Sequence, residues 1–252
     1  MPESGPVATP TRVLRRGAAE IRVYADAAVL VEAAAQALLE VQRHGPFHLA
    51  LAGGSTPEAL YRRIAQQSTA TWDRTQVWFG DERSVGPDHL DSNFRMAYDA
   101  MLAQVPIAAE AVHRMRGELP ADEAARLYEA ELRAAFGDVE HPRFDLVLLG
   151  VGEDGHTASL FPGTAALTAA TTSWVAANFV PKLDTWRITL TMPVLCAATR
   201  VWIFAVGARK VEILRGVLGE VHAPERWPVQ GVSPSPGALV WWLDEAAAAE
   251  LE

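Results

Sequence analysis

Residues 144–156 read Phe-Asp-Leu-Val-Leu-Leu-Gly-Val-Gly-Glu-Asp-Gly-His, a short apolar run followed directly by a glycine-rich turn. An apolar run of this length, bounded by glycines, is typical of a strand buried on both faces of a parallel sheet. In open α/β sheets ligands bind beyond the carboxyl ends of the strands, where this turn lies. Glycines let the backbone approach a ligand closely, and His156 can exchange a proton near neutral pH. The stretch therefore predicts an α/β fold with a catalytic loop.

Two other interpretations of this turn compete with the catalytic one. Gly150, Gly152 and Gly155 satisfy the dinucleotide fingerprint G-x-G-x-x-G, which expects an acidic residue about 20 residues further on. Residues 171–175 offer no acid, and Pro162 interrupts any long helix, so a nicotinamide cofactor is not expected. A tight turn with a structural histidine is the other alternative, and for a lone histidine it is the favoured one. The catalytic interpretation therefore depends on what surrounds His156.

The rest of the chain repeats the alternation of apolar runs and helical segments. Strands are predicted at residues 21–24, 47–52, 76–79, 187–192, 201–206 and 238–243, and helices at residues 27–42, 57–66, 93–103 and 121–136, from about residue 209 and after Asp244. This order predicts the α/β class, with an open, mostly parallel, doubly wound (Rossmann-like) sheet covered by helices on both faces. We expect one domain over residues 1–252, in which residues 1–12 form a loose leader.

Composition limits the possible functions. The apolar runs are shorter than a membrane span, and the single cysteine, Cys196, excludes an internal disulfide and fits a reducing compartment. Without cysteine pairs or close histidine pairs, no metal site is expected. The net charge of −9 argues against nucleic acid as a partner, so an anionic substrate would need a locally basic pocket. We expect a cytoplasmic protein, monomeric or weakly homo-oligomeric, that acts on a small molecule.

A second glycine-rich turn lies between a predicted strand and a predicted helix. Gly53 and Gly54 precede two hydroxyls, Ser55 and Thr56, at the start of the helix. Glycines, hydroxyls and free backbone N–H groups at a helix start form an anion cradle. Ordinary helix capping by Ser55, with Glu58 completing a capping box, explains the hydroxyls but not the glycine pair. Phosphate binding is therefore favoured, without the lysine of a nucleotide P-loop.

Charged side chains follow other strands at the same edge of the sheet. Asp81 and Arg83 end the third predicted strand, and Lys210 follows a strand and Gly207 at the start of a helix. Three adjacent charges are usually a solvated cluster, but the carboxyl end of a strand favours a place in the site. Lys210 can pair with phosphate as a point charge. Arg187 could add a forked contact, although spacing alone fits a surface arginine equally well.

Taken together and in order, these segments resemble the 6-phosphogluconolactonase family. No single motif is specific, but the ordered set covers residues 20–245. Gly86, where the family has proline, and residues 227–230 depart from the pattern without touching the proposed chemistry. The matching segments are residues 53–57, 81–83 with His89 and 92–93, 149–150, 154–162 and 187–191, and Gly207 with Lys210.

The resemblance implies a fold shared with glucosamine-6-phosphate deaminases and ribose-5-phosphate isomerases. It also implies hydrolysis of 6-phospho-D-glucono-1,5-lactone to 6-phospho-D-gluconate, in the oxidative pentose phosphate pathway and without a cofactor. His156 would be the general base on water, and Asp154 and Asp81 are expected to be catalytic in roles the sequence leaves open. Backbone N–H groups of a glycine-rich turn could stabilise the oxyanion. The phosphate would be held, or its pocket lined, by Gly53, Gly54, Ser55, Thr56, Arg83, Arg187 and Lys210.

Two other functions compete with the lactonase. The related deaminases resemble this chain at Asp81 and residues 154–156, but they expect a glutamate five residues after the histidine. Phe161 stands there, which favours the lactonase. A sugar-phosphate sensor would bind the ligand without turnover. Such sensors usually carry a DNA-binding helix pair, and residues 1–20 are too short and too broken by proline to form one.

Overall fold

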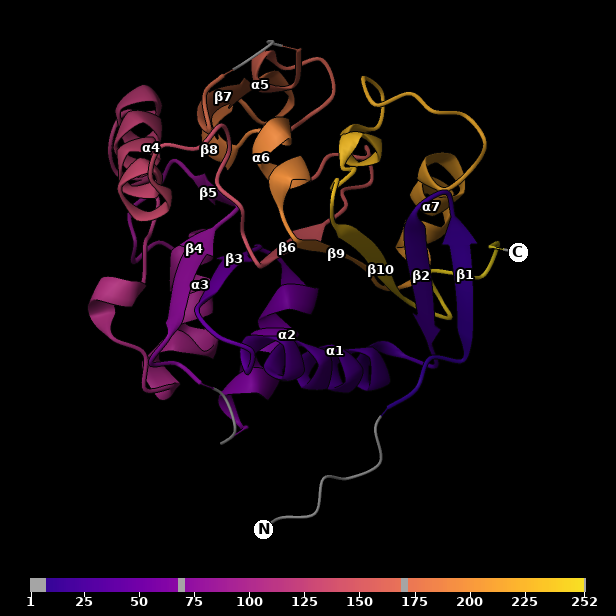
Figure 1. Cartoon of the computed structure of the whole chain (residues 1–252). Helices are drawn as coiled ribbons and strands as arrows, with labels where there is room; N and C mark the ends of the chain where they lie inside the picture. The colour runs from indigo at the N-terminus through magenta and orange to yellow at the C-terminus, as the bar shows by residue number, and fades with distance from the viewer. Residues whose placement is uncertain (1–7, 68–70, 169–171, 252) are drawn as a thin grey trace.

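A computed structural model describes residues 8–67, 71–168 and 172–251, and its centre is a seven-stranded sheet (Figure 1). Every neighbouring pair in this sheet is parallel except β1 and β2. The predicted open, mostly parallel sheet is therefore confirmed. In spatial order its strands are β1 (Arg12–Arg16), β2 (Ala19–Tyr24), β10 (Ala238–Asp244), β9 (Arg200–Ala205), β6 (Leu146–Gly150), β3 (Phe47–Leu51) and β4 (Thr75–Phe79).

Helices cover both faces of this sheet. One face carries α1 (Ala27–Gln42), α2 (Ser55–Ala65) and α3 (Asn93–Ala100), and the other carries α4 (Ala121–Phe136), α6 (Met192–Ala197) and α7 (Val211–Val217). Because successive side chains of a strand point to opposite faces, Trp241 and Trp242 of β10 belong to two different cores, and both are buried. The remaining short elements are α5 (Ala165–Thr168) and the 3₁₀ turns η1 (Leu102–Gln104), η2 (Ala109–Ala111), η3 (Pro181–Leu183), η4 (Ala208–Lys210) and η5 (Pro228–Gly231).

A second sheet was not predicted. It is antiparallel, three-stranded, and composed of β5 (Asp81–Arg83), β8 (Thr185–Leu190) and β7 (Val175–Val180), and it lies with α4 and α6 above the main sheet in Figure 1. The chain crosses between the sheets at Gly80, whose N–H donates to Leu51 O in the main sheet and whose carbonyl accepts from Leu190 N in the second. Residues 81–83 are therefore a strand of their own.

The two ends of the described chain differ from expectation. Arg12, placed in the loose leader, begins β1, and residues 1–7 lie outside the described residues. The helix expected after Asp244 is wrong, because residues 245–250 form turns. The Arg12 guanidinium donates to the carbonyls of Ala248 and Leu251, which fixes this segment as a turn against β1. Among the described helices, none is long and apolar enough to cross a bilayer.

Candidate active site

A cavity of about 560 Å³ lies at the carboxyl ends of β3, β6 and β9, with the second sheet beside it. This is where ligands bind in open α/β sheets. All the residues that the sequence singled out for the site line this one cavity: Gly53, Gly54, Ser55, Thr56, Asp81, Arg83, Asp154, His156, Arg187 and Lys210.

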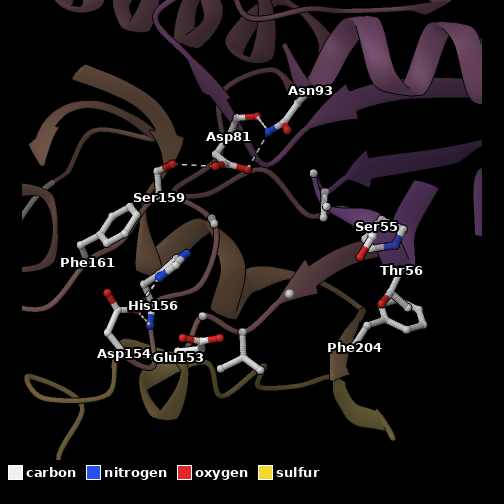
Figure 2. Close-up of a pocket in the computed structure, with 18 of the residues that line it drawn as sticks. Ser55, Thr56, Asp81, Asn93, Glu153, Asp154, His156, Ser159, Phe161 and Phe204 are labelled. Carbon is white, nitrogen blue, oxygen red and sulfur yellow. Dashed lines mark hydrogen bonds and ion pairs between the residues drawn. The ribbon is translucent and has the colours of Figure 1, made fainter. Parts of the chain in front are cut away.

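The loop after β6 forms a carboxylate–imidazole pair. Asp154 Oδ1 lies 2.5 Å from His156 Nδ1 and also accepts from the His156 backbone N–H (Figure 2). The hydrogen bond from His156 holds the pKa of Asp154 well below its usual range, so the carboxylate is ionised. An ionised carboxylate only accepts, which places a proton on Nδ1, so in a neutral ring Nε2 would be the acceptor. Both members of the pair line the cavity.

The imidazole is held on its other sides as well. The ring of Phe161 is stacked on it with centroids 4.0 Å apart and 20° between the planes, and Phe161 itself is buried. Gly152 makes room for the ring, because a Cβ at this position would lie 2.1 Å from two of its atoms. The orientation of the His156 ring is therefore fixed by a hydrogen bond, by a stacked ring and by the close approach of the backbone.

Asp81 occupies the opposite wall, in a network that the sequence did not predict. Its Oδ2 accepts from Ser159 Oγ at 2.6 Å, and Asn93 Nδ2 donates to its backbone carbonyl at 2.9 Å and to Oδ1 at 3.3 Å (Figure 2). Ser159 and Asn93 are themselves buried and line the cavity. Both fall in segments that carried the family resemblance, and this resemblance was the one signal that could have pointed to them as site residues. Asp81 is thus positioned by Ser159 from the loop after β6 and by Asn93 from the start of α3.

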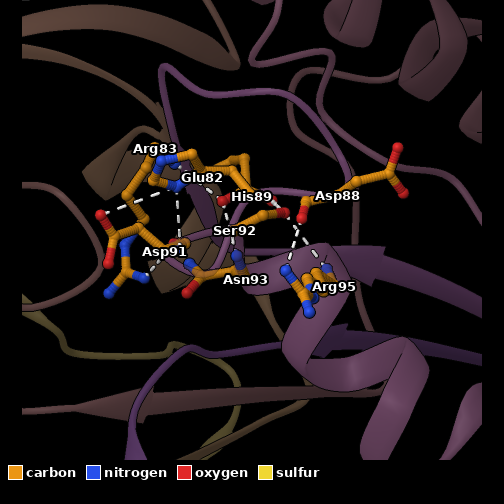
Figure 3. A network of polar contacts seen from close by, with 8 residues as sticks. All are labelled: Glu82, Arg83, Asp88, His89, Asp91, Ser92, Asn93 and Arg95. Carbon is orange, nitrogen blue, oxygen red and sulfur yellow. Dashed lines mark hydrogen bonds and ion pairs between the residues drawn. The ribbon is translucent and has the colours of Figure 1, made fainter.

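Glu82, between two site residues, has a different role. Its carboxylate accepts from Ser92 Oγ and from the backbone N–H groups of Arg83, Asn93 and Phe94, at 2.7–3.0 Å (Figure 3). Burial raises the pKa of this carboxyl group, an effect opposed by these four donors. Glu82 therefore ties β5 to the first turn of α3 and so holds Asn93 in place. His89, in the loop between them, is about half exposed and does not line the cavity.

The start of α2 provides a set of unpaired donors. Gly54 is the residue that caps the helix, and its φ of 104° is a conformation that favours glycine. The alternative of a capping box by Ser55 and Glu58 is not borne out, because the Glu58 side chain pairs with Arg62 and no side chain among the described residues caps α2. Its first N–H groups and the hydroxyls of Ser55 and Thr56 are thus available to an anion.

Cationic side chains complete the lining. Arg83 and Arg187 are register partners in β5 and β8. Burial lowers the pKa of Arg187, and the positive charge of Arg83 lowers it further. Lys210 Nζ donates to Val151 O at 2.8 Å, which holds it beside the loop after β6. Two more cations, Arg209 and Lys182, line the cavity and were missed, because neither stands in a motif. Within the described part of the chain, no cluster of three metal-ligating side chains occurs.

Comparisons with known proteins agree with this geometry. The family model of glucosamine-6-phosphate isomerases/6-phosphogluconolactonase matches residues 20–241. A protein of Nostoc sp. named 6-phosphogluconolactonase is 43% identical over 219 residues, which cover 84% of this chain and 87% of that protein. The solved structure of 6-phosphogluconolactonase from Trypanosoma cruzi matches with a TM-score of 0.79 and 28% identity, over 92% of this chain and 96% of that one. A solved monomeric glucosamine-6-phosphate deaminase has the same fold (TM-score 0.76, 21% identity, 91% and 98% coverage).

Proposed function

The chain belongs to the family of glucosamine-6-phosphate isomerases and 6-phosphogluconolactonases, and from this we propose that it hydrolyses 6-phospho-D-glucono-1,5-lactone to 6-phospho-D-gluconate. The observation that carries the proposal is the Asp154–His156 pair, oriented into a cavity whose other lining groups suit a phosphorylated sugar. The names of the relatives support the same substrate. All the lining residues come from one chain, and the expected monomer or weak homo-oligomer stays a prediction.

In the proposed mechanism His156 acts as the general base. Nε2 accepts a proton from a water molecule as its oxygen attacks the lactone carbonyl carbon, which creates a tetrahedral oxyanion and an imidazolium. The intermediate collapses by breaking the bond between this carbon and the ring oxygen. The imidazolium returns its proton to the departing oxygen, so the products are a carboxylic acid and a hydroxyl. Asp154 stabilises the imidazolium and fixes the tautomer throughout.

Substrate binding is assigned to the other polar groups that line the cavity. The first N–H groups of α2, Ser55 and Thr56 would hold the phosphate together with Lys210 and Arg187, as charge-assisted donors. Asp81 Oδ1 receives only a long contact of 3.3 Å from Asn93, so it retains acceptor capacity for a sugar hydroxyl. On this proposal the phosphate lies at the start of α2 and the lactone carbonyl lies beside His156.

Phe161 favours the lactonase over the deaminase. Ring opening of an amino sugar would need a further proton-transfer group beside the histidine, and the position five residues after His156 is filled by an apolar ring stacked on the imidazole. A direct comparison decides between the two activities. We expect acid release from fresh 6-phosphogluconolactone and no ammonia release from glucosamine 6-phosphate. Ammonia release at a comparable rate would overturn the assignment.

The role of His156 is tested by replacing it with alanine and with asparagine. Loss of proton transfer should lower kcat by roughly 10²–10⁴-fold, with spontaneous hydrolysis subtracted, and leave KM much less changed. His44→Ala is the matched control, because His44 is an exposed histidine that pairs only with Glu40 among its described neighbours. A folded His156→Ala protein with near-normal kcat would contradict the mechanism and direct attention to Asp81 or Asp154.

A further inference from the structure

The lysines of this chain are unusually few and lie in one place. Of 22 basic residues only two are lysines, Lys182 and Lys210, and both line the cavity of the active site. Lys210 follows a strand end and is accounted for as a phosphate ligand. Lys182 belongs to no motif and has no role in the mechanism described above. Its position therefore needs a separate explanation.

Lys182 reaches the site from the second sheet. It lies in η3, the short turn that joins β7 to β8, and Asp184 reverses the chain there with φ of 47°. The tip of this hairpin meets the catalytic loop, because Lys182 Nζ lies 3.4 Å from Asp154 Oδ2. The other oxygen of the same carboxylate holds His156 Nδ1. One carboxylate thus bridges an ammonium group and the imidazole.

Resting on the proposed function, we propose that Lys182 is a positioning residue for the general base, acting on His156 through Asp154. It restrains the Asp154 carboxylate at Oδ2, the oxygen that does not hold His156 Nδ1. Its positive charge also offsets part of the negative charge that would otherwise favour the imidazolium. The result is a base that stays neutral, and therefore competent to accept a proton, to a lower pH.

The other charges around the pair do not duplicate this contact. Among the described residues, the ion-pair partners of Asp154 are His156 and Lys182. The further charged groups at the cavity come from the catalytic loop, β5, β8 and η4. One more cation, Arg226, lies over the ring of Trp227, and Trp227 packs on Gly155 of the catalytic loop. The charged groups that line the cavity besides the pair and Lys182 are Glu153, Asp81, Arg83, Arg187, Arg209 and Lys210.

The expected effect is modest because Lys182 is exposed. Its side chain is 73% accessible, so solvent and salt screen its charge. Lys182→Met should raise the pKa of His156 by about 0.2–0.7 pH unit at low ionic strength, and shift the acid limb of the kcat profile to higher pH by the same amount. Lys182→Arg should restore most of the wild-type profile. High salt should remove the difference between wild type and Lys182→Met.

The experiment reads the titration of His156 in two ways. NMR of the imidazole in the free protein follows protonation without turnover, and kcat with 6-phosphogluconolactone against pH follows it in catalysis. The NMR signal is assigned with His156→Asn, and thermal melting shows that each variant is folded. The NMR arm remains decisive if the chain proves inactive on the lactone, so failure of the proposed function and failure of this inference are distinguishable.

An upward shift in Lys182→Met that is reversed in Lys182→Arg would support the inference. An unchanged titration of His156 in a folded Lys182→Met protein would overturn it. A rise in KM with no shift in the pH profile would also overturn it, because Lys182 would then act on the substrate phosphate and not on the base.

Discussion

Two buried tyrosines provide the sharpest test of how the fold holds the site. Tyr61 of α2 and Tyr128 of α4 approach the main sheet from opposite faces, and each hydroxyl is inserted at the carboxyl end of a strand. The Tyr61 hydroxyl accepts from Ala52 N at 2.9 Å and donates to Ala52 O at 2.8 Å. The Tyr128 hydroxyl makes the same pair of bonds to Phe79, at 2.8 and 3.1 Å. Burial raises the pKa of both hydroxyls, so each keeps the proton that it donates.

Replacing either tyrosine by phenylalanine should leave one backbone N–H and one carbonyl without a partner. A buried unsatisfied group costs about 1–3 kcal/mol, and we expect about 2–4 kcal/mol in the free energy of unfolding for each variant after relaxation. For a chain of this size each kcal/mol lowers Tm by about 2–4 °C. Tyr61→Phe should also raise KM, because Ala52 leads directly into Gly53 and Gly54, and a displaced Ala52 would shift this proposed phosphate-binding turn.

The assay is urea unfolding followed by circular dichroism, beside steady-state kinetics on the lactone. Tyr98→Phe is the matched control, because Tyr98 is about half exposed on α3 and its removed hydroxyl lies at the surface. That variant should change the free energy of unfolding by no more than about 0.5 kcal/mol. If Tyr61→Phe and Tyr128→Phe are no less stable than Tyr98→Phe, the two hydroxyls do not hold the strand ends and the reasoning is refuted.

Three further predictions follow from single contacts. Lys210→Ala removes a charge-assisted contact to phosphate worth about 1.5–3 kcal/mol, so KM should rise with kcat less affected, and an unchanged KM would remove Lys210 from the site. Glu82→Gln turns an amide N–H₂ toward N–H donors and should lower the free energy of unfolding by about 1–3 kcal/mol in urea melts, whereas an unaltered midpoint would contradict the anchoring of α3. The pKa of Asp154 is depressed, so its contribution to the free energy of unfolding is present above about pH 4 and is lost as the pH falls below that. The decrease in the free energy of unfolding between pH 7 and about pH 3 should therefore be smaller in His156→Ala than in wild type. Equal decreases in the two proteins would argue against the pair.

The parts of the site that could be predicted from sequence are those fixed by a strand end. Residues 53–56 and 154–156 follow β3 and β6, and parallel strands bring their carboxyl ends to one edge whatever the loops do. The apolar runs were strong local signals, and α1 and α4 have the predicted bounds. Placement at the edge therefore came from periodicity. Phosphate binding at residues 53–56 and proton exchange at His156 were predicted from residue types, and the lactone substrate came from the family resemblance.

What could not be predicted depends on pairing between distant segments. The segment Asp81–Arg83 is short and charged, and only its register with β8 makes it a strand. An apolar pattern shows that residues near 188 form a strand but not which sheet receives them. Lys182 reaches Asp154 because the β7–β8 hairpin folds back over the loop, 28 residues away in sequence. Ser159 likewise meets Asp81 across 78 residues, a contact that no local pattern indicates.

The charges of the cavity connect these observations to substrate binding. A chain with net charge −9 can attract a phosphorylated sugar only if the site is locally basic. Five cationic and three anionic side chains line the cavity, so its lining carries +2 while the rest of the chain is strongly acidic. The anions are not spread evenly, since Asp154 is paired with the base and Asp81 is held by Ser159. On the proposed function, hydrolysis creates a new carboxylate in a cavity that is also lined by Asp81, Glu153 and Asp154. Repulsion between these like charges would weaken binding of the acid product relative to the lactone, and so would favour release of the product.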